Sequence, residues 1–284
     1  MDNRELSAGL RARVALEKFG FRNAHALGQN FLLDEGLLNA LLDAAEVGGD
    51  DFVVEIGPGA GVMTALLADR CREVLAVELD RKLEPVLQTV LAGHDNARVV
   101  FQDFMKADLN ALVGQQPYRV VANLPYYITA DILLKLVCGA RRPESVCIMV
   151  QKEAAERIMS RPGAKQWCAL AAMVQYYGTP SVLMDVPPEA FDPPPHVMSQ
   201  FLRIDRHPSP EAVPGNEATF FRLVNAAFAM RRKTLANNLK ASFGMDQGTA
   251  QRVLEAAGMD PRVRGEALSL RELCRVSDVI DKGV

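Results

Sequence analysis

The sequence lacks the long hydrophobic runs and the leader segment that would place a protein in or across a membrane. No apolar stretch in its 284 residues approaches the ~18–20 residues that a membrane-spanning helix requires. The stretch from Met1 to Arg13 carries charges of both signs and has no apolar centre, which is atypical of a secretory signal. We therefore expect a cytoplasmic protein that does not act at a membrane.

Cysteine and histidine are also scarce, and neither is arranged as a ligand set. No C-x-x-C pair occurs, and an odd number of dispersed cysteines indicates reduced thiols rather than a disulfide framework. The four histidines show no metal-ligand spacing either. The sequence therefore predicts no metal site and no disulfide; the five cysteines stand at positions 71, 138, 147, 168 and 274.

An overall excess of positive charge is absent as well. The formal net charge is −3, so the chain as a whole exerts no attraction on nucleic acid. Residues 218–245, however, contain no acidic residue and form a local basic segment. This segment is the predicted contact for RNA phosphates, although a solvated helix face would have the same composition. Its basic residues are Arg222, Arg231, Arg232, Lys233 and Lys240.

Short apolar runs alternate with helical patterns over the first 150 residues. Such near-continuous apolar runs are typical of strands in a parallel sheet that is covered on both faces. Right-handed crossovers between them give an α/β fold with a doubly wound sheet. The predicted strands span residues 52–56, 74–78, 98–102, 119–122 and 146–150.

The second half of the chain changes character. Two further strand-like runs, 181–186 and 199–204, flank a connection that holds five prolines in residues 187–195. Proline fixes φ, so we expect a rigid connection and an antiparallel edge added to the sheet. Beyond the linker-like residues 207–216 only helical periods follow.

These patterns predict two domains. The first spans residues 1–207, of which 1–30 form an N-terminal extension, and residues 28–32 are expected to be a loop. The second spans residues 208–284 and is small and all-helical. A chain of this length is sufficient for one large core and one small core.

A glycine-containing loop, V-E-I-G-P-G-A-G at residues 54–61, joins the first predicted strand to a helix. Glycine lets the backbone approach a ligand closely beside a helix N-terminus, although a generic turn is the alternative. Glu78 ends the second strand, where an acid accepts hydrogen bonds from a ribose. Asp103 follows the third strand, where it could accept an adenine amine. We therefore assign cofactor binding to Gly57, Gly59, Glu78 and Asp103.

Two cofactors compete for this loop. A dinucleotide fits it less well, because Val62 stands where G-x-G-x-x-G has its third glycine. Glu55 lies just before the loop, where its carboxylate would repel a pyrophosphate. S-adenosylmethionine has no phosphate; its sulfonium and amino groups tolerate nearby acids. The sequence thus favours the methyl donor over a nicotinamide cofactor and disfavours an oxidoreductase.

The fourth predicted strand runs directly into N-L-P-Y-Y at residues 123–127. With this motif the sequence resembles the rRNA adenine N6,N6-dimethyltransferase family, whose members dimethylate two adjacent adenosines near the 3′ end of small-subunit rRNA. The resemblance extends from about Gly28 to the C-terminus and rests on seven motifs in the family's order. They are L-G-Q-N-F-L (27–32), V-E-I-G-P-G (54–59), V-E-L-D (77–80), N-L-P-Y-Y (123–127), Q-K-E-A-A-E-R (151–157), F-D-P-P-P (191–195) and R-R-K-T-L (231–235).

The resemblance implies a Rossmann-like class I methyltransferase sheet, followed by a helical rRNA-docking domain. It implies S-adenosylmethionine as the cofactor and small-subunit rRNA in a pre-30S particle as the partner, with the target adenosines in the 3′-terminal hairpin loop. We expect a monomer that acts during ribosome assembly without a metal. Asn30, Leu32 and Asn123 resemble family positions that contact the cofactor, although for Asn30 and Leu32 a simple loop before a helix is the alternative.

The N-L-P-Y motif is also expected to bind and activate the base. The amine of adenine is a poor nucleophile because its lone pair is delocalised into the ring. The Asn123 side-chain oxygen and the Leu124 carbonyl would hold its two hydrogens and favour a pyramidal nitrogen. Pro125 presets the turn, and Tyr126 would stack on a base that has left its helix or loop. Phe191 resembles the family's second stacking ring, with a core phenylalanine as the alternative.

Other positions carry weaker expectations. We assign Tyr127 to packing and Asp80 to a helix cap. Several positions depart from the usual family pattern and put RNA affinity and fine orientation in doubt: His25, His196, Met198 and the pair Trp167-Cys168.

Two further functions compete with the small-subunit enzyme. A large-subunit rRNA adenine methyltransferase is disfavoured by the acidic balance of the chain and by Tyr126, where such enzymes more often carry phenylalanine. A non-catalytic ribosome assembly factor on the same fold would have no need for Glu78, Asp103 and Asn123 together.

Overall fold

A computed structural model describes residues 6–21, 30–208 and 212–283. The chain forms two compact units that interleave along the sequence. The first comprises Met1–Ala155 and Ser181–Asp205, and the second comprises Glu156–Pro180 and Arg206–Val284. Residues 156–180 thus cluster with the C-terminal residues, and the domain boundary at residue 207 stays a prediction.

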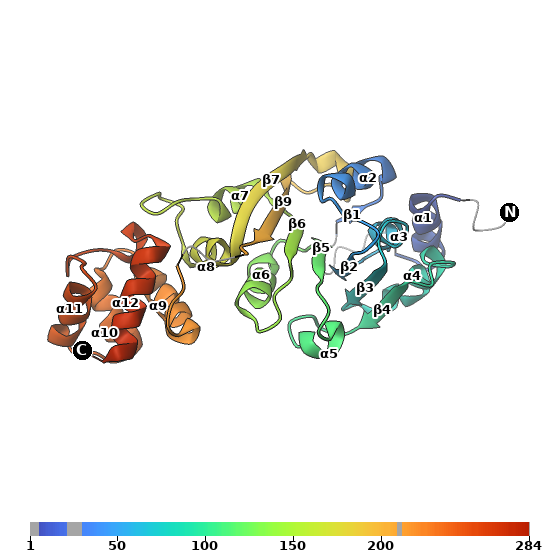
Figure 1. Ribbon diagram of the computed structural model, residues 1–284. Coiled ribbons are helices and arrows are strands. Elements are labelled where there is room, and N and C mark those ends of the chain that lie inside the picture. Colours follow the sequence, from blue (N-terminus) through green and yellow to red (C-terminus); the bar gives the residue numbers. More distant parts are fainter. Residues whose placement is uncertain (1–5, 22–29, 209–211, 284) are drawn as a thin grey trace. The chain divides into compact units, whose positions relative to one another are not determined.

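The first unit is built on a seven-stranded sheet in the order β4-β3-β2-β5-β6-β9-β7 (Figure 1). Five of its strands are parallel, and each lies within one residue of its predicted bounds. The doubly wound α/β prediction is therefore confirmed. The parallel strands are β2 (Phe52–Ile56), β3 (Glu73–Glu78), β4 (Ala97–Phe101), β5 (Arg119–Asn123) and β6 (Ser145–Gln151).

Helices connect the strands and bury their apolar faces against the sheet. Every residue of β2 is buried, as expected for a central strand that is covered on both faces. One continuous core joins α1 to α4 with one face of the strands. The helices of this unit are α1 (Ala8–Lys18), α2 (Glu35–Ala44), α3 (Val62–Ala68), α4 (Glu84–Val90), α5 (Leu109–Val113) and α6 (Thr129–Cys138).

The sheet continues past β6 with two longer strands, β7 (Gly178–Val186) and β9 (Ser199–Arg206). Strand β9 pairs antiparallel with β6, and β7 is the outermost strand. The antiparallel extension predicted from residues 181–204 is confirmed. The proline-rich connection crosses between these strands and carries Phe191.

The prediction of a plain loop at residues 28–32 was wrong for its last two residues. Phe31 and Leu32 form strand β1, which pairs antiparallel with β8 (Phe191–Asp192), and Leu32 lies opposite Phe191. A two-residue strand has no periodic pattern, so only its tertiary partner defines it. Residues 28 and 29, like His25, lie outside the described residues.

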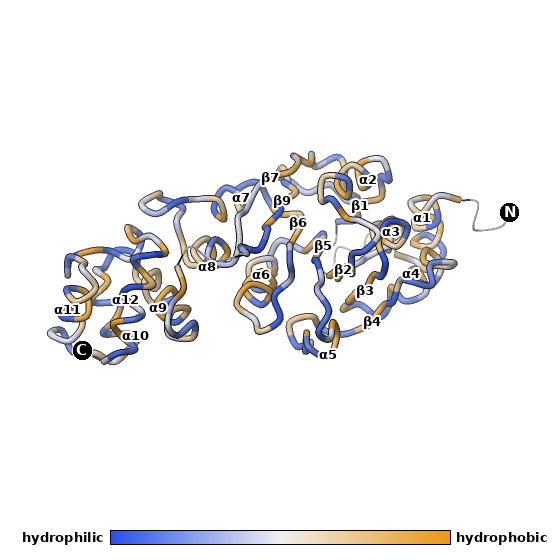
Figure 2. Tube along the Cα trace, in the orientation of Figure 1, coloured by the Kyte–Doolittle hydropathy of each residue, from blue (hydrophilic) through white to orange (hydrophobic). Residues whose placement is uncertain are grey.

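The second unit is helical, as predicted for the C-terminal part of the chain. Figure 2 shows hydrophobic and hydrophilic residues alternating along its helices, which bury one face each. Trp167 is completely buried and meets Phe228 edge to face, with 6.2 Å between the ring centroids. Its helices are α8 (Ala169–Tyr177), α9 (Glu217–Ala229), α10 (Leu235–Phe243), α11 (Gln247–Ala256) and α12 (Leu270–Lys282), and α7 (Lys152–Ile158) directly follows β6.

Candidate active site

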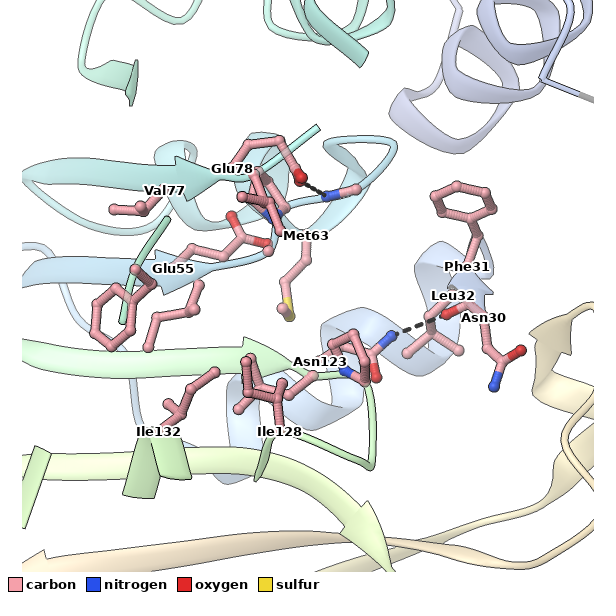
Figure 3. A pocket seen from close by; sticks show the side chains of 18 of the residues that line it. Asn30, Phe31, Leu32, Glu55, Met63, Val77, Glu78, Asn123, Ile128 and Ile132 are labelled. Atoms are coloured by element: carbon pink, nitrogen blue, oxygen red, sulfur yellow. Dashed lines mark hydrogen bonds between the residues drawn. The ribbon is translucent and has the colours of Figure 1, made fainter. Parts of the chain in front are cut away.

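A pocket opens where the parallel strands of the first unit end (Figure 3). Strand β2 pairs with β3 on one side and with β5 on the other, so the chain reverses its winding direction here. Ligands of doubly wound sheets bind at this switch point. The lining includes every residue predicted for the cofactor or the base: Asn30, Leu32, Gly57, Gly59, Glu78, Asp103, Asn123, Leu124, Pro125, Tyr126 and Phe191.

The glycine loop has a backbone that few other residues could adopt. Gly57, Gly59 and Gly61 all have positive φ, at 70°, 56° and 81°. A Cβ atom on Gly59 would stand 3.2 Å from the Phe31 ring, whereas the space around the corresponding position on Gly57 is open. The loop is therefore closely packed on one side and free to receive a ligand on the other.

Glu78 braces this loop from the end of β3. Its carboxylate accepts hydrogen bonds from the backbone N–H of Gly59 at 3.1 Å and of Asp80 at 2.8 Å. Burial raises the pKa of Glu78, while these backbone donors oppose the rise. A carboxylate retains further lone pairs after two bonds, so Glu78 can also accept from a diol. The Asp80 side chain accepts from the N–H of Lys82 and caps the following turn, as predicted.

Asp103 lies on the loop that follows β4. The side chain of Lys135, on α6, holds this loop by hydrogen bonds. The Lys135 ammonium donates to the carbonyls of Phe104, Met105 and Ala107 at 2.7, 2.9 and 2.7 Å. Burial lowers the pKa of Lys135, and the nearby Asp103 carboxylate counteracts this effect. Sequence reasoning missed Lys135, because a lysine in a helix gives no sign that it serves a loop about 30 residues earlier.

The side-chain amide of Asn123 is oriented by a contact across the pocket. Its Nδ2 donates to the backbone carbonyl of Asn30 at 3.2 Å, shown as a dashed line in Figure 3. The described residues place no donor on its Oδ1 or on the Leu124 carbonyl. This network presents the Asn123 oxygen as an acceptor at the end of β5.

Tyr126 is fixed at both ends of its ring. Its hydroxyl lies 2.6 Å from the Oγ of Ser199, a fully buried residue at the start of β9. The backbone beside it is held where the Pro125 carbonyl accepts from the Ile128 N–H and the Thr129 hydroxyl, each at 3.2 Å. Burial raises the pKa of Tyr126. Ser199 was not predicted, because it is 73 residues away in the sequence.

Phe191 and Tyr127 both line the pocket but differ in how much of each residue is exposed. Phe191 lines the pocket but is 4% exposed and belongs to the hydrophobic core, so its stacking role stays a prediction. The assignment of Tyr127 to packing was wrong, because 71% of this residue is exposed beside the pocket.

Glu55 supplies a second buried acid to the pocket lining. It is completely buried, and both carboxylate oxygens lack a hydrogen-bond partner among the described residues. Burial raises the pKa of Glu55 to about 8, and the charge of Glu78 adds to the rise. The nearby Thr64 hydroxyl lowers the pKa of Glu55 and so opposes part of this rise, although it forms no well-aligned hydrogen bond with the carboxyl group. Burial thus favours the neutral acid, which weakens the charge repulsion of a pyrophosphate that the sequence predicted for Glu55.

The polar side chains that line the pocket fit S-adenosylmethionine better than a dinucleotide. Among the described residues, the lining contains the acids Glu55, Glu78 and Asp103 but no lysine or arginine. A pyrophosphate would lack a cationic partner there, whereas an adenosine with a cationic sulfonium meets acceptors. No group of three potential metal ligands occurs within the described residues, nor does any described helix have the length and apolarity to cross a bilayer.

The predicted RNA-binding residues all lie in the second unit. Some of them contact other groups of the protein, and others are exposed. Arg222 donates to the Ser242 carbonyl and lies 4.3 Å above the Phe243 ring. Arg231 pairs with Glu266 at 3.1 Å. Arg232, Lys233 and Lys240 are exposed. The basic segment is thus partly engaged within the protein itself.

Comparison with known families and proteins gives a consistent result. The signature of the family described as ribosomal RNA adenine dimethylase matches residues 20–282. A protein of Geobacillus thermodenitrificans named ribosomal RNA small subunit methyltransferase A is 39% identical over 98% of both chains. A protein of the same name from Clostridium perfringens is 40% identical over 99% of both chains.

Solved structures with the same fold include two enzymes that are named as transferases. A dimethyladenosine transferase from Plasmodium falciparum superposes with a TM-score of 0.71 at 24% identity, covering 86% of this chain and 94% of that one. The 23S rRNA methyltransferase ErmE superposes with a TM-score of 0.65 at 26% identity, covering 89% and 100%. The class I methyltransferase architecture with a C-terminal helical region is thereby established.

Proposed function

The chain belongs to the ribosomal RNA adenine dimethylase family, and from this premise we propose that it dimethylates two adjacent adenosines of small-subunit rRNA. The methyl groups go from S-adenosylmethionine to the exocyclic N6 of adenosines in the 3′-terminal hairpin loop. The name of the relatives at 39% and 40% identity supports the small subunit as the target. We further propose a cytoplasmic monomer that acts on a pre-30S particle.

The cofactor is assigned to the pocket at the switch point. When bound, S-adenosylmethionine supplies an electrophilic methyl group. Glu78 would accept hydrogen bonds from its ribose, and Asp103 would accept from its adenine amine. Gly57 would give it close access to the backbone, and Asn30 and Leu32, which also line the pocket, would contact its other end.

The orientation of Asn123 is the observation that carries the proposal. Because its Nδ2 is committed to the Asn30 carbonyl, its Oδ1 is left as an acceptor. Together with the Leu124 carbonyl it can hold the two hydrogens of the adenine amine. This arrangement would localise the lone pair on nitrogen and aim it into the pocket, so that orientation rather than prior proton abstraction promotes transfer. The C–S bond of the donor breaks as the N–C bond forms, S-adenosylhomocysteine leaves, and the cationic methylated nitrogen then loses its proton to water.

Tyr126 and Phe191 would grip the target base. The Ser199 contact fixes the Tyr126 ring, which lowers the ordering cost of stacking. Base–aromatic stacking contributes ~1–3 kcal/mol per base in single-strand binders. Pairing of β1 with β8 ties the Phe191 segment to Leu32 on the cofactor side of the pocket. One small sheet would therefore position groups for both substrates.

Transfer of labelled methyl groups tests this function. Small subunits lacking the modification should accept label from wild-type protein, while fully modified subunits and naked rRNA should not. The variant Asn123→Ala should lose activity by roughly 10²–10³-fold, as expected when one aligned polar group is removed from a reaction site. Asn110→Ala, an exposed position on α5, serves as the matched control.

Other outcomes point to other functions. The similarity to ErmE supports a large-subunit methyltransferase as the second candidate. Equal labelling of large-subunit rRNA would favour that candidate. Particle binding without any labelling would favour a non-catalytic assembly factor.

A further inference from the structure

Large apolar side chains are exposed around the mouth of the pocket. Tyr127 and Leu79, which line it, are 71% and 59% exposed. Val197 and Met198, which are 44% and 38% exposed, do not line the pocket but directly precede Ser199, the hydrogen-bond partner of Tyr126. Single exposed apolar residues are ordinary, but a group around one opening marks an interaction surface.

Tyr127 is the most exposed of the four and the only aromatic one. It follows Tyr126 directly and lies between the end of β5 and the start of α6, both of which are fixed elements. Its backbone is also held, because the turn is closed by the Ile128 N–H and Thr129 hydroxyl on the Pro125 carbonyl. An aromatic ring on a held backbone at the mouth of a base pocket can stack at a reduced entropic cost.

We propose that Tyr127 stacks on the nucleobase adjacent to the target adenosine. This inference rests on the proposed function and deepens it. A nucleotide whose base enters the pocket leaves its neighbour at the mouth, where Tyr127 and Leu79 present an apolar surface. Since the two target adenosines are adjacent, the surface would hold one of them while the other reacts. Tyr127 would thus be a specificity-determining residue for the dinucleotide.

The test compares Tyr127→Leu with Tyr127→Phe in methyl transfer to unmodified small subunits. Loss of stacking should raise the KM for the particle by about 5- to 150-fold, the range that corresponds to one stacked base. Tyr127→Phe should stay close to wild type, and the affinity of both variants for S-adenosylhomocysteine should be unchanged. Phe19→Leu, which removes an exposed ring elsewhere in the first unit, is the matched control.

Particles reconstituted with an abasic site next to the target adenosine identify the contact. On these particles wild type and Tyr127→Leu should have equal KM values. The inference would be overturned if Tyr127→Leu kept its full rise in KM on the abasic particles, or if its KM on intact particles equalled that of wild type. It would also be overturned if Tyr127→Phe showed the same rise in KM as Tyr127→Leu. Wild-type protein that labels no particle would instead overturn the proposed function, and this inference with it.

Discussion

Glu55 shows how a single buried residue can contribute to the pH dependence of stability. Its pKa is about 8 in the folded protein, against an ordinary value of 4.5, because burial disfavours the charged form. Between these values the folded state holds a proton that the unfolded state has lost. The contribution of Glu55 to the free energy of unfolding should therefore fall as the pH rises from about 4.5 to about 8, by at most about 5 kcal/mol.

Glu55→Gln should remove the contribution of this residue, because the amide has the same shape but does not titrate. Thermal unfolding midpoints measured from pH 5 to pH 9 should decline less steeply for the variant than for wild type. Glu189→Gln, an exposed position, should follow the wild-type curve. A variant that keeps the full wild-type decline would assign the effect to another group.

Residue types in the site were accessible from the sequence, but their mutual contacts were not. The motifs named Asn123 and Tyr126 correctly as pocket residues. The bonds that orient them come from Asn30 and Ser199, which are 93 and 73 residues away. Local patterns carry no information about such pairs, because the fold alone brings them together.

The loop after β4 is held by one side chain of helix α6, Lys135. Lys135 offers three N–H donors and uses them on three carbonyls of this loop. Lys135→Met should leave those carbonyls without a charged partner and loosen Asp103. Each charge-assisted bond contributes about 1.5–3 kcal/mol, part of which water replaces in the variant. We expect the Kd for S-adenosylhomocysteine to rise by about tenfold or more.

A kinetic comparison separates this positioning role from a general loss of stability. The KM for S-adenosylmethionine should rise in Lys135→Met, while kcat at saturation should stay near the wild-type value. Lys135→Arg should recover part of the affinity, because the guanidinium also donates several bonds. Lys106→Met removes an exposed lysine that pairs with Asp103 at 3.6 Å and should have little effect. A fall in kcat alone would contradict the assignment.

Long elements were predictable and short ones were not. The parallel strands were found within one residue, because each is an apolar run bounded by turn residues. Strand β1 was missed, since two residues show no period and their pairing with β8 is a tertiary event. The same holds for Phe191, whose burial could not be inferred from its proline-rich surroundings.

At the scale of the whole molecule, charge and chemistry are divided between the two units. The lining of the pocket in the first unit contains three acids and, among the described residues, no lysine or arginine. The basic segment lies in the second unit, although the chain carries a net charge of −3. Nucleic-acid affinity must therefore come from a local surface, and its strength should depend on salt.

Neutralising the exposed residues of the basic segment tests whether this segment supplies the affinity for RNA. The triple variant Arg232→Gln, Lys233→Gln and Lys240→Gln should weaken binding to small subunits and reduce the slope of log K against log salt by roughly 2–3, since each lost phosphate contact removes ~0.7–0.9. The Kd for S-adenosylhomocysteine should not change, because the cofactor pocket belongs to the first unit. Changing Arg252, Arg275 and Lys282 to glutamine makes the same change in net charge on other exposed positions of the second unit. If this control lowered the salt slope equally, total charge rather than the basic segment would govern RNA binding.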